Sequence, residues 1–178
     1  MVSQLDAPLR DSSHSLPYSV EGLLQVFTCP HRSFFTSVMA QALRIAGQGT
    51  SVLIVQFLKG GIRQGSNNPV QLGQNLDWIR CDLPRCINTP DLEEEETIAL
   101  RELWRYMQAA VAQGKYSMVV LDELSLVMNF GLISEAEVLN FLKSRPSQVD
   151  VILTGPDMPE SILNIADQIT ELRRTHRP

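Results

Sequence analysis

Two adjacent carboxylates, Asp122 and Glu123, follow directly on an apolar run and are the residues best suited to chemistry in this sequence. An apolar strand that ends in Asp-Glu has the form of a Walker B strand. In such a strand the Asp holds Mg²⁺, usually through water, and the Glu can act as a base. The alternative is a strand end whose carboxylates cap the next turn. The residues alone leave both interpretations open.

A loop at residues 28–36 stands where nucleotide-binding α/β proteins bind phosphate. The order around it is strand, loop, helix, turn, strand, yet "TCPHRSFFT" contains neither glycine nor lysine. Glycines let backbone N–H groups wrap a phosphate, and Pro30 removes one N–H altogether. Arg32 and Thr36 still offer a charge and a hydroxyl, which leaves open a weak anion site at the helix N-terminus. The candidate residues of this loop are Thr28, Arg32, Ser33, Phe34, Phe35 and Thr36.

Alternating strands and helices must position these residues. Apolar runs predict strands over 23–28, 51–58, 116–124 and 149–155. Helices are predicted over 33–46, 90–112, 134–145 and 159–172, the last with a short strand at its end. This alternation predicts an α/β fold with a mostly parallel sheet and helices on both faces. Ligands of such sheets bind beyond the carboxyl ends of the strands. The loop, the two carboxylates and the turn "LTGPD" after Thr154 all stand at such ends.

Local signals set the expected helix ends and loops. Thr89 is predicted as the N-cap and Pro90 as the first residue of the second helix, with the four glutamates that follow in its first turn. Ser134, with Glu137 three residues on, predicts a capping box. The Gly-, Asn- and Gln-rich segment 59–75 predicts a mobile loop.

Composition and charge narrow the class of protein. The length of 178 residues predicts one domain, residues 20–178, after a flexible lead-in at 1–19. A net charge of −5 argues against nucleic-acid binding. No run reaches the ~18 apolar residues of a membrane span, and the N-terminus lacks the apolar core of a secretory signal, so a cytoplasmic protein is expected. Cys81 and Cys86 have no His or second Cys pair nearby, and no metal site is predicted from them.

Several motifs, taken in series, resemble one family. The segments "VLIVQFLKG", "YSMVVLDELSLVMNFGLISEAEVLNFLKSRP", "VILTG" and "ADQITELR" resemble, in order and spacing, the P-loop ATP:corrinoid adenosyltransferases, which transfer the adenosyl group of ATP to the cobalt of a reduced corrinoid. The resemblance implies a parallel P-loop (RecA-like) sheet and a homodimer. It also implies that Asp122 and Glu123 lie near magnesium and the nucleotide, and that Gln56, Lys59 and Gly60 line the nucleotide and corrinoid edge.

The first loop departs from the family's pattern, which resembles Thr-Gly-Asp-Gly-Lys-Gly-Lys-Thr-Thr. Aligned on Thr28, all three glycines are replaced, Phe34 stands for the key lysine, and Phe35 stands for the threonine after it. Pro156 also stands where the family usually has Arg after "LTG". We expect Phe34 to fill the vacated space as part of the core. For Phe35, burial against the sheet and exposure at a partner surface stay open.

Three functional hypotheses follow. The leading hypothesis is a non-catalytic adenosyltransferase relative that binds or regulates a protein partner, with no cofactor and no catalytic residue assigned. The alternative is an active ATP:corrinoid adenosyltransferase of cobalamin biosynthesis or salvage, which holds Mg-ATP unconventionally through Arg32 and Lys59 and takes a corrinoid substrate. A third is a carrier of a corrinoid or another small ligand. The loop at 28–36 discriminates between the first two, because an enzyme needs ordered phosphate donors there.

Overall fold

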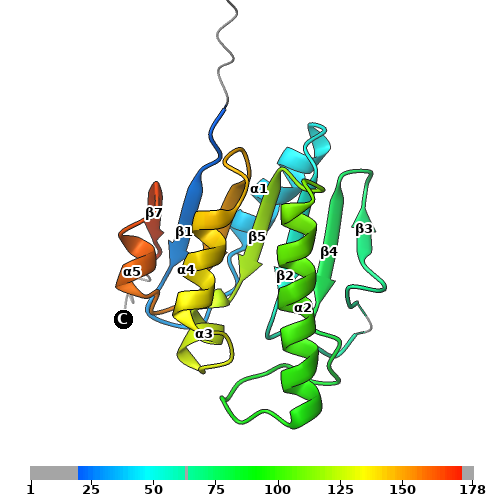
Figure 1. Ribbon diagram of the computed structural model, residues 1–178, viewed down its shortest axis with the longest axis vertical. Coiled ribbons are helices and arrows are strands. Elements are labelled where there is room, and N and C mark those ends of the chain that lie inside the picture. The colour runs from blue at the N-terminus through cyan, green and yellow to red at the C-terminus, as the bar shows by residue number, and fades with distance from the viewer. Residues whose placement is uncertain (1–19, 63, 174–178) are drawn as a thin grey trace, which may run out of the picture.

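A computed structural model describes residues 20–62 and 64–173 of the chain (Figure 1). The expected lead-in at 1–19 lies outside the described residues. The strands are β1 (Leu24–Thr28), β2 (Val52–Gln56), β3 (Val70–Leu72), β4 (Leu76–Arg80), β5 (Met118–Asp122), β6 (Asp150–Thr154) and β7 (Gln168–Glu171). The helices are α1 (Thr36–Gly47), α2 (Glu94–Ala112), α3 (Leu124–Asn129), α4 (Glu135–Ser144) and α5 (Glu160–Leu163).

The strands form one sheet in the order β3-β4-β2-β5-β6-β1-β7. Every neighbouring pair is parallel except β3 and β4, which are antiparallel. The predicted mostly parallel α/β sheet is therefore confirmed. Its register places Gln56 at the end of β2 between Arg80 of β4 and Asp122 of β5. Polar residues thus stand side by side along the carboxyl edge of the sheet.

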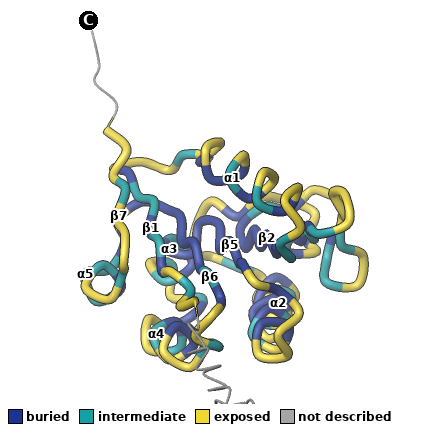
Figure 2. Tube along the Cα trace, turned by 90° about the horizontal axis from the view of Figure 1, so that it is seen from above, coloured by how far each residue is buried: buried dark blue, intermediate teal, exposed yellow. Residues whose placement is uncertain are grey.

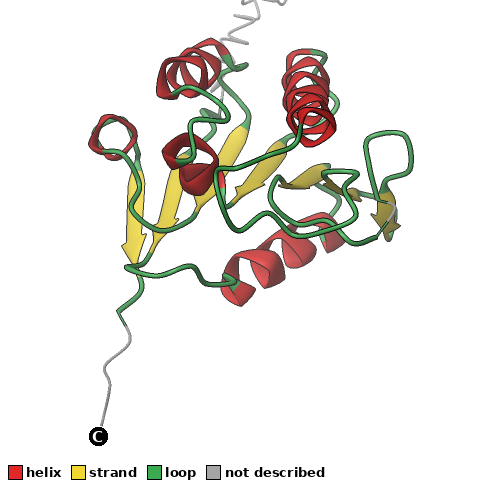
Figure 3. Cartoon of the chain, turned by 90° about the horizontal axis from the view of Figure 1, so that it is seen from below, coloured by secondary structure: helices red, strands yellow, loops and turns green. Residues whose placement is uncertain are grey.

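Helices cover both faces of the sheet, as predicted. Helices α2, α3, α4 and α5 lie on one face and α1 lies on the other (Figures 2 and 3). The larger apolar cluster packs beneath α2 and α4, and the smaller one packs between α1 and the sheet. All five residues of β2 and all five of β5 are buried. Any polar side chain at the ends of these two strands must therefore find its hydrogen bonds inside the protein.

The start of helix α4 agrees with the prediction from the sequence, and the start of helix α2 differs from it. Helix α4 begins after Ser134, whose hydroxyl accepts a hydrogen bond from the N–H of Glu137, so the predicted capping box is confirmed. Helix α2 begins at Glu94 and not at Pro90. At this start the Glu96 carboxylate accepts a hydrogen bond from the backbone N–H of Glu93 (3.1 Å). This bond satisfies one of the N–H groups that have no partner within a helix, and it places the start of α2 after the predicted Pro90.

The two edges of the sheet differ from the sequence prediction in different ways. Residues 70–72 of the expected mobile loop form β3, which pairs with β4 at one edge of the sheet. The helix predicted over 159–172 is only the short α5, and the short strand expected at its end is β7, which pairs with β1 at the other edge. Pairing with β1 satisfies the β7 backbone on one side, an outcome that helical periodicity cannot reveal. In the described part of the chain, no helix combines the length and apolar character needed to cross a membrane.

Candidate functional site

Glu123 follows the last residue of β5 in a backbone conformation that L residues seldom adopt. Its φ is 60°, in the left-handed region, and such positions persist where the surrounding structure holds them. Its N–H donates to Thr154 Oγ1 (3.0 Å) at the end of the neighbouring β6. The side chain is only 2% exposed. A carboxylate buried to this extent requires partners that balance its charge.

Arg32 from the loop supplies that balance. Its Nε and Nη2 donate to the two carboxylate oxygens of Glu123 at 2.5 and 2.7 Å, a bidentate ion pair. Its Nη1 donates to the carbonyl of Ile87 (2.9 Å) and to Asn88 Oδ1 (2.5 Å). Lys59 Nζ lies 3.5 Å from Glu123 Oε1. The hydrogen bond to Glu123 raises the pKa of Arg32. One guanidinium therefore joins the loop, the turn after β5 and the segment before α2.

Asp122 is buried and forms its hydrogen bonds with a different set of side chains from those that contact Glu123. Gln56 Nε2 donates to its Oδ2 (2.7 Å), and Thr154 Oγ1 donates to its Oδ1 (2.8 Å). Burial raises the pKa of Asp122, against the opposite effect of these two hydrogen bonds. Gln56 Oε1 in turn accepts from Trp78 Nε1 (3.0 Å) and Arg80 Nε (2.8 Å). A continuous polar row thus crosses the carboxyl ends of β4, β2, β5 and β6.

This arrangement does not fit a hydrated Mg²⁺ at the two carboxylates. Both oxygens of Glu123 accept hydrogen bonds from Arg32, and both oxygens of Asp122 accept hydrogen bonds from Gln56 and Thr154. Asp122 and Glu123 are also only 1% and 2% exposed, so a hydrated cation could contact either carboxylate only after neighbouring groups had moved. Elsewhere in residues 20–62 and 64–173, no three His, Cys, Asp or Glu side chains are placed to hold a metal ion.

The two phenylalanines of the loop, Phe34 and Phe35, differ in burial. Phe35 is buried between α1 and the sheet with Val38 and Met39, which settles the alternative left open for it. Phe34 is 50% exposed, so the expectation that it fills the core is wrong. The backbone at Phe35 is not helical, with φ −86° and ψ 77°, and α1 begins only at Thr36 rather than at Ser33 as predicted. Phe34 therefore precedes the helix and is not part of the packed cluster to which Phe35 belongs.

The other candidate residues are less closely connected to the carboxylates. Thr36 is exposed at the start of α1 and Ser33 is half-buried. Thr28 ends β1, where its carbonyl accepts from the N–H of Leu172 (2.9 Å). Gly60 has a packing role, because a Cβ there would lie 2.1 Å from the carbonyl oxygen of Arg85. The structure thus joins Arg32 and Lys59 to Glu123, and Gln56 to Asp122, and leaves these four outside that network.

Sequence reasoning missed four members of the network. Asn88, Trp78 and Arg80 were not nominated, and Thr154 was noted only as part of a turn. A usable signal existed for two of them, since Arg80 and Thr154 are the last residues of parallel strands. The carboxyl ends of parallel strands meet at one edge.

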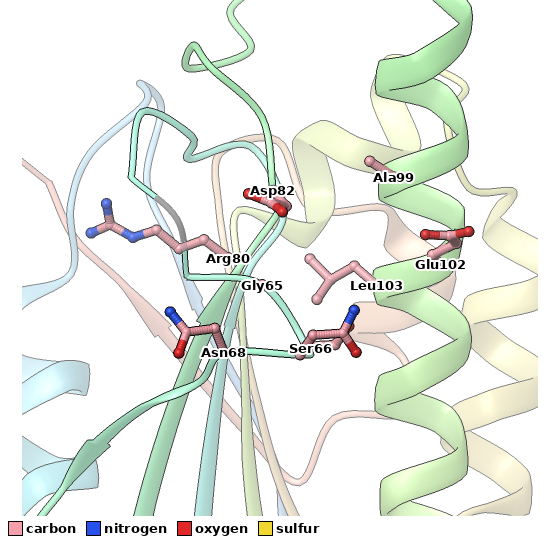
Figure 4. A pocket seen from close by; sticks show the side chains of 9 residues that line it. Gly65, Ser66, Asn68, Arg80, Asp82, Ala99, Glu102 and Leu103 are labelled. Atoms are coloured by element: carbon pink, nitrogen blue, oxygen red, sulfur yellow. The ribbon is translucent and has the colours of Figure 1, made fainter.

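A separate cavity lies beyond the carboxyl end of β4. It has a volume of about 230 Å³ and lies between the segment 65–68, Asp82 and helix α2 (Figure 4). Leu103 of α2 points into it, and the carboxylates of Asp82 and Glu102 stand at its sides (Figure 4). Of the residues nominated from the sequence, none lines it. Its nearest link to the site is Arg80, which also lines the cavity.

Residues 20–178 match the family model of the ATP:corrinoid adenosyltransferases BtuR/CobO/CobP. The chain belongs to this family. It is 32% identical over 154 residues to the corrinoid adenosyltransferase of Escherichia coli, which covers 85% of this chain and 76% of that protein. It is 29% identical over 160 residues to corrinoid adenosyltransferase CobA of Salmonella typhimurium, with the same two coverages. It is also 33% identical over 133 residues, 71% of this chain, to an uncharacterized protein of Nostoc sp., of which the match covers 35%.

Membership in the adenosyltransferase family confirms the resemblance stated for the four motifs between Val52 and Arg173. The description of the family model names ATP and a corrinoid, and the two bacterial relatives are named corrinoid adenosyltransferases. In this member of the family, the carboxylates at the end of β5 are bonded to side chains of the same chain. The functional question is whether those internal bonds give way to a nucleotide.

Proposed function

We propose that this member of the adenosyltransferase family is a non-catalytic protein that binds or regulates a protein partner. The observation that carries the proposal is the bidentate ion pair between Arg32 and Glu123. It places a protein cation against the carboxylate that the family resemblance assigns to the magnesium and nucleotide site. The protein thereby supplies from its own chain the positive charge that a metal ion would bring.

The loop adds a second reason, because it offers few phosphate donors. It has no glycine to open the backbone, Pro30 lacks an N–H, and Phe34 stands in place of the lysine. A lost charged hydrogen bond alone is worth about 1.5–3 kcal/mol. Together with the displacement of Arg32, the loss exceeds about 4 kcal/mol, which is about a thousandfold in affinity for a triphosphate.

A second candidate function is an active transferase that grips the triphosphate in another way. It is favoured by the similarity to enzymes named corrinoid adenosyltransferases and by two cations beside the site. Arg32 and Lys59 both contact Glu123. If they turned from Glu123 to a phosphate, they would provide charge without a glycine-rich loop.

Adenosyl transfer to reduced cobalamin in the presence of Mg-ATP separates the two functions. The reaction is followed by the change in the corrinoid absorption spectrum, with the Escherichia coli relative as the positive control. We expect no rate above that of a sample without protein. Turnover that depends on this chain, and that falls in the Lys59→Ala variant, would establish the second candidate and overturn the first.

A further inference from the structure

The segment between β4 and α2 lies along the carboxyl edge of the sheet. Residues 82–92, which we call the strap, contain no helix or strand. In Figure 1 they follow the lower, carboxyl edge of the sheet from the end of β4 to the start of α2. Ligands of parallel α/β sheets bind beyond this edge. The strap therefore lies where it can restrict access to the carboxylates at the end of β5.

Contacts along its length hold the strap against the rest of the protein. The N–H of Gly61 donates to the carbonyl of Leu83 (2.7 Å). The guanidinium of Arg85 forms a bidentate pair with Glu96 of α2 (2.7 and 2.6 Å). The N–H of Ile87 donates to a backbone carbonyl just after β2 (2.9 Å), and its side chain is fully buried. A segment without regular structure depends on such individual contacts for its local stability.

One guanidinium holds both the strap and the turn after β5. Nη1 of Arg32 donates to the carbonyl of Ile87 (2.9 Å) and to Asn88 Oδ1 (2.5 Å), which both belong to the strap. Nε and Nη2 of the same side chain donate to Glu123. If the loop at 28–36 moves, the strap loses two hydrogen bonds. If the strap moves, the guanidinium loses two of these four hydrogen bonds.

The closed arrangement shields the carboxylates at the end of β5 from solvent. Asp122 is 1% exposed and Glu123 is 2% exposed. Both oxygens of Glu123 accept hydrogen bonds from Arg32. A ligand or partner group that reaches Glu123 must first separate it from Arg32, and the same guanidinium also holds the strap. The contact is therefore autoinhibitory, because the closed form leaves Glu123 inaccessible.

We propose that Arg32 is a latch that couples the strap to the loop at 28–36, so that the two segments open and close together. The carboxyl edge then has a closed form, which the structure shows, and an open form, in which Glu123 can be reached. The inference goes beyond the proposed function and does not rest on it, because it concerns access to this edge and not the identity of what binds there.

Two buried cysteines report the two segments separately. Cys29 belongs to the loop and packs in the cluster between α1 and the sheet. Cys81 directly precedes the strap and packs in the cluster on the other face. Their exposed fractions are 7% and 0%. Burial raises the pKa of Cys81 to about 12. Because the thiolate is the reactive form, modification of this thiol requires that its surroundings open.

The test is the rate at which N-ethylmaleimide modifies each thiol of the full chain, followed by mass spectrometry of its peptides. The exposed Cys86 is first replaced by Ser. Arg32→Ala is expected to raise the rates at Cys29 and Cys81 at least about tenfold, since charged hydrogen bonds of both segments are lost. A third thiol, introduced by Ala110→Cys at a buried position of α2, reports opening of the whole fold and is expected to react more slowly than the other two.

A second variant loosens the strap at a point away from the loop. Glu96→Gln weakens the anchor at Arg85 and is expected to raise the rate at Cys81 and, through the latch, at Cys29. In Arg32→Ala the latch is absent, so adding Glu96→Gln should no longer change the rate at Cys29. Glu137→Gln is the matched control. Glu137 is likewise the capping-box carboxylate of a helix and pairs with an arginine, but it lies on α4, so both rates should stay unchanged.

Three results would overturn the proposal. In the first, Arg32→Ala raises the rate at only one of Cys29 and Cys81, or at neither, so that the segments open independently. In the second, Glu96→Gln raises the rate at Cys29 equally with and without Arg32. In the third, all three thiols react equally fast in Arg32→Ala, which means that the whole fold opens. None of these results bears on ATP binding, so the proposed function is tested separately.

Discussion

Removal of the Arg32 side chain tests whether the ion pair at the sheet edge holds the site together. Glu123 is 2% exposed when Arg32 is present, and in Arg32→Ala the only ion-pair partner left to it is Lys59 at 3.5 Å. Breaking a fully buried pair by removing one partner costs about 3–5 kcal/mol. The Arg32 side chain is 29% exposed, so water already screens part of this interaction. We therefore expect the free energy of unfolding to fall by about 2–3 kcal/mol.

Urea unfolding, extrapolated linearly to zero denaturant, measures this difference. Arg32→Lys keeps the charge and loses the bidentate geometry, so its loss is expected to be intermediate. Arg105→Ala removes an exposed arginine of α2 and is the matched control, with a change of less than about 0.5 kcal/mol. In Arg32→Ala/Glu123→Gln the unpaired charge is gone, and the double variant is expected to regain at least about 1 kcal/mol over Arg32→Ala.

The reasoning would be refuted by two outcomes. One is an Arg32→Ala protein within about 0.5 kcal/mol of the parent, as for ordinary surface substitutions. The other is a double variant whose loss equals the sum of the two single losses, because additivity would mean that the side chains do not interact.

Three further predictions concern the loop, a tight contact and pH. Phe34→Lys alone is expected to give no adenosyl transfer in the spectroscopic assay, since the glycines stay absent, and measurable turnover would contradict this. Gly155→Ala is expected to lower the free energy of urea unfolding by about 3 kcal/mol or more, because the new Cβ would lie 2.1 Å from Ser125 Oγ at a φ of +137°. Gly47→Ala, with open space around it, is the control and should change it by less than about 1 kcal/mol; equal effects would refute the steric argument. An arginine partner lowers the pKa of Glu96 from its ordinary value of 4.5, so the ionised side chain stabilises the fold above that pH and the contribution is lost as pH falls below it. Glu96→Gln should therefore lower the Tm at about pH 7, and this effect should shrink as the pH falls below 4.5 and through the lowered pKa of Glu96. A constant difference in circular-dichroism melts would refute it.

The central part of the fold could be predicted from the sequence because its signals are local. The apolar runs that became β2 and β5 are buried along their whole length, and such runs indicate strands covered on both faces. The Ser134 capping box is likewise a matter of four consecutive residues. The edge strand β3 was not predicted, because three residues within a Gly- and Asn-rich segment carry no strand signal of their own. The short final strand was predicted, but the length of the helix before it was overestimated, because β7 pairs with β1, which lies far away along the chain.

The candidate site could be predicted only in part, for the same reason. The residue types of Asp122 and Glu123 are apparent in the sequence, but their partners are not. Arg32 lies 91 residues before Glu123, and Gln56 lies 66 residues before Asp122. Which of two adjacent phenylalanines is buried depends on where α1 begins, and Phe35 lies just before that start.

The most direct test of the account is a calorimetric titration of the chain with Mg-ATP up to about millimolar concentration, a range that detects binding free energies down to about −4 kcal/mol. The account predicts no heat beyond that of dilution, because the Arg32 guanidinium is already paired with the Glu123 carboxylate and the loop offers few hydrogen-bond donors for phosphate. Binding in the micromolar range would contradict it. The loop would then hold a triphosphate, and the chain would belong with the active transferases.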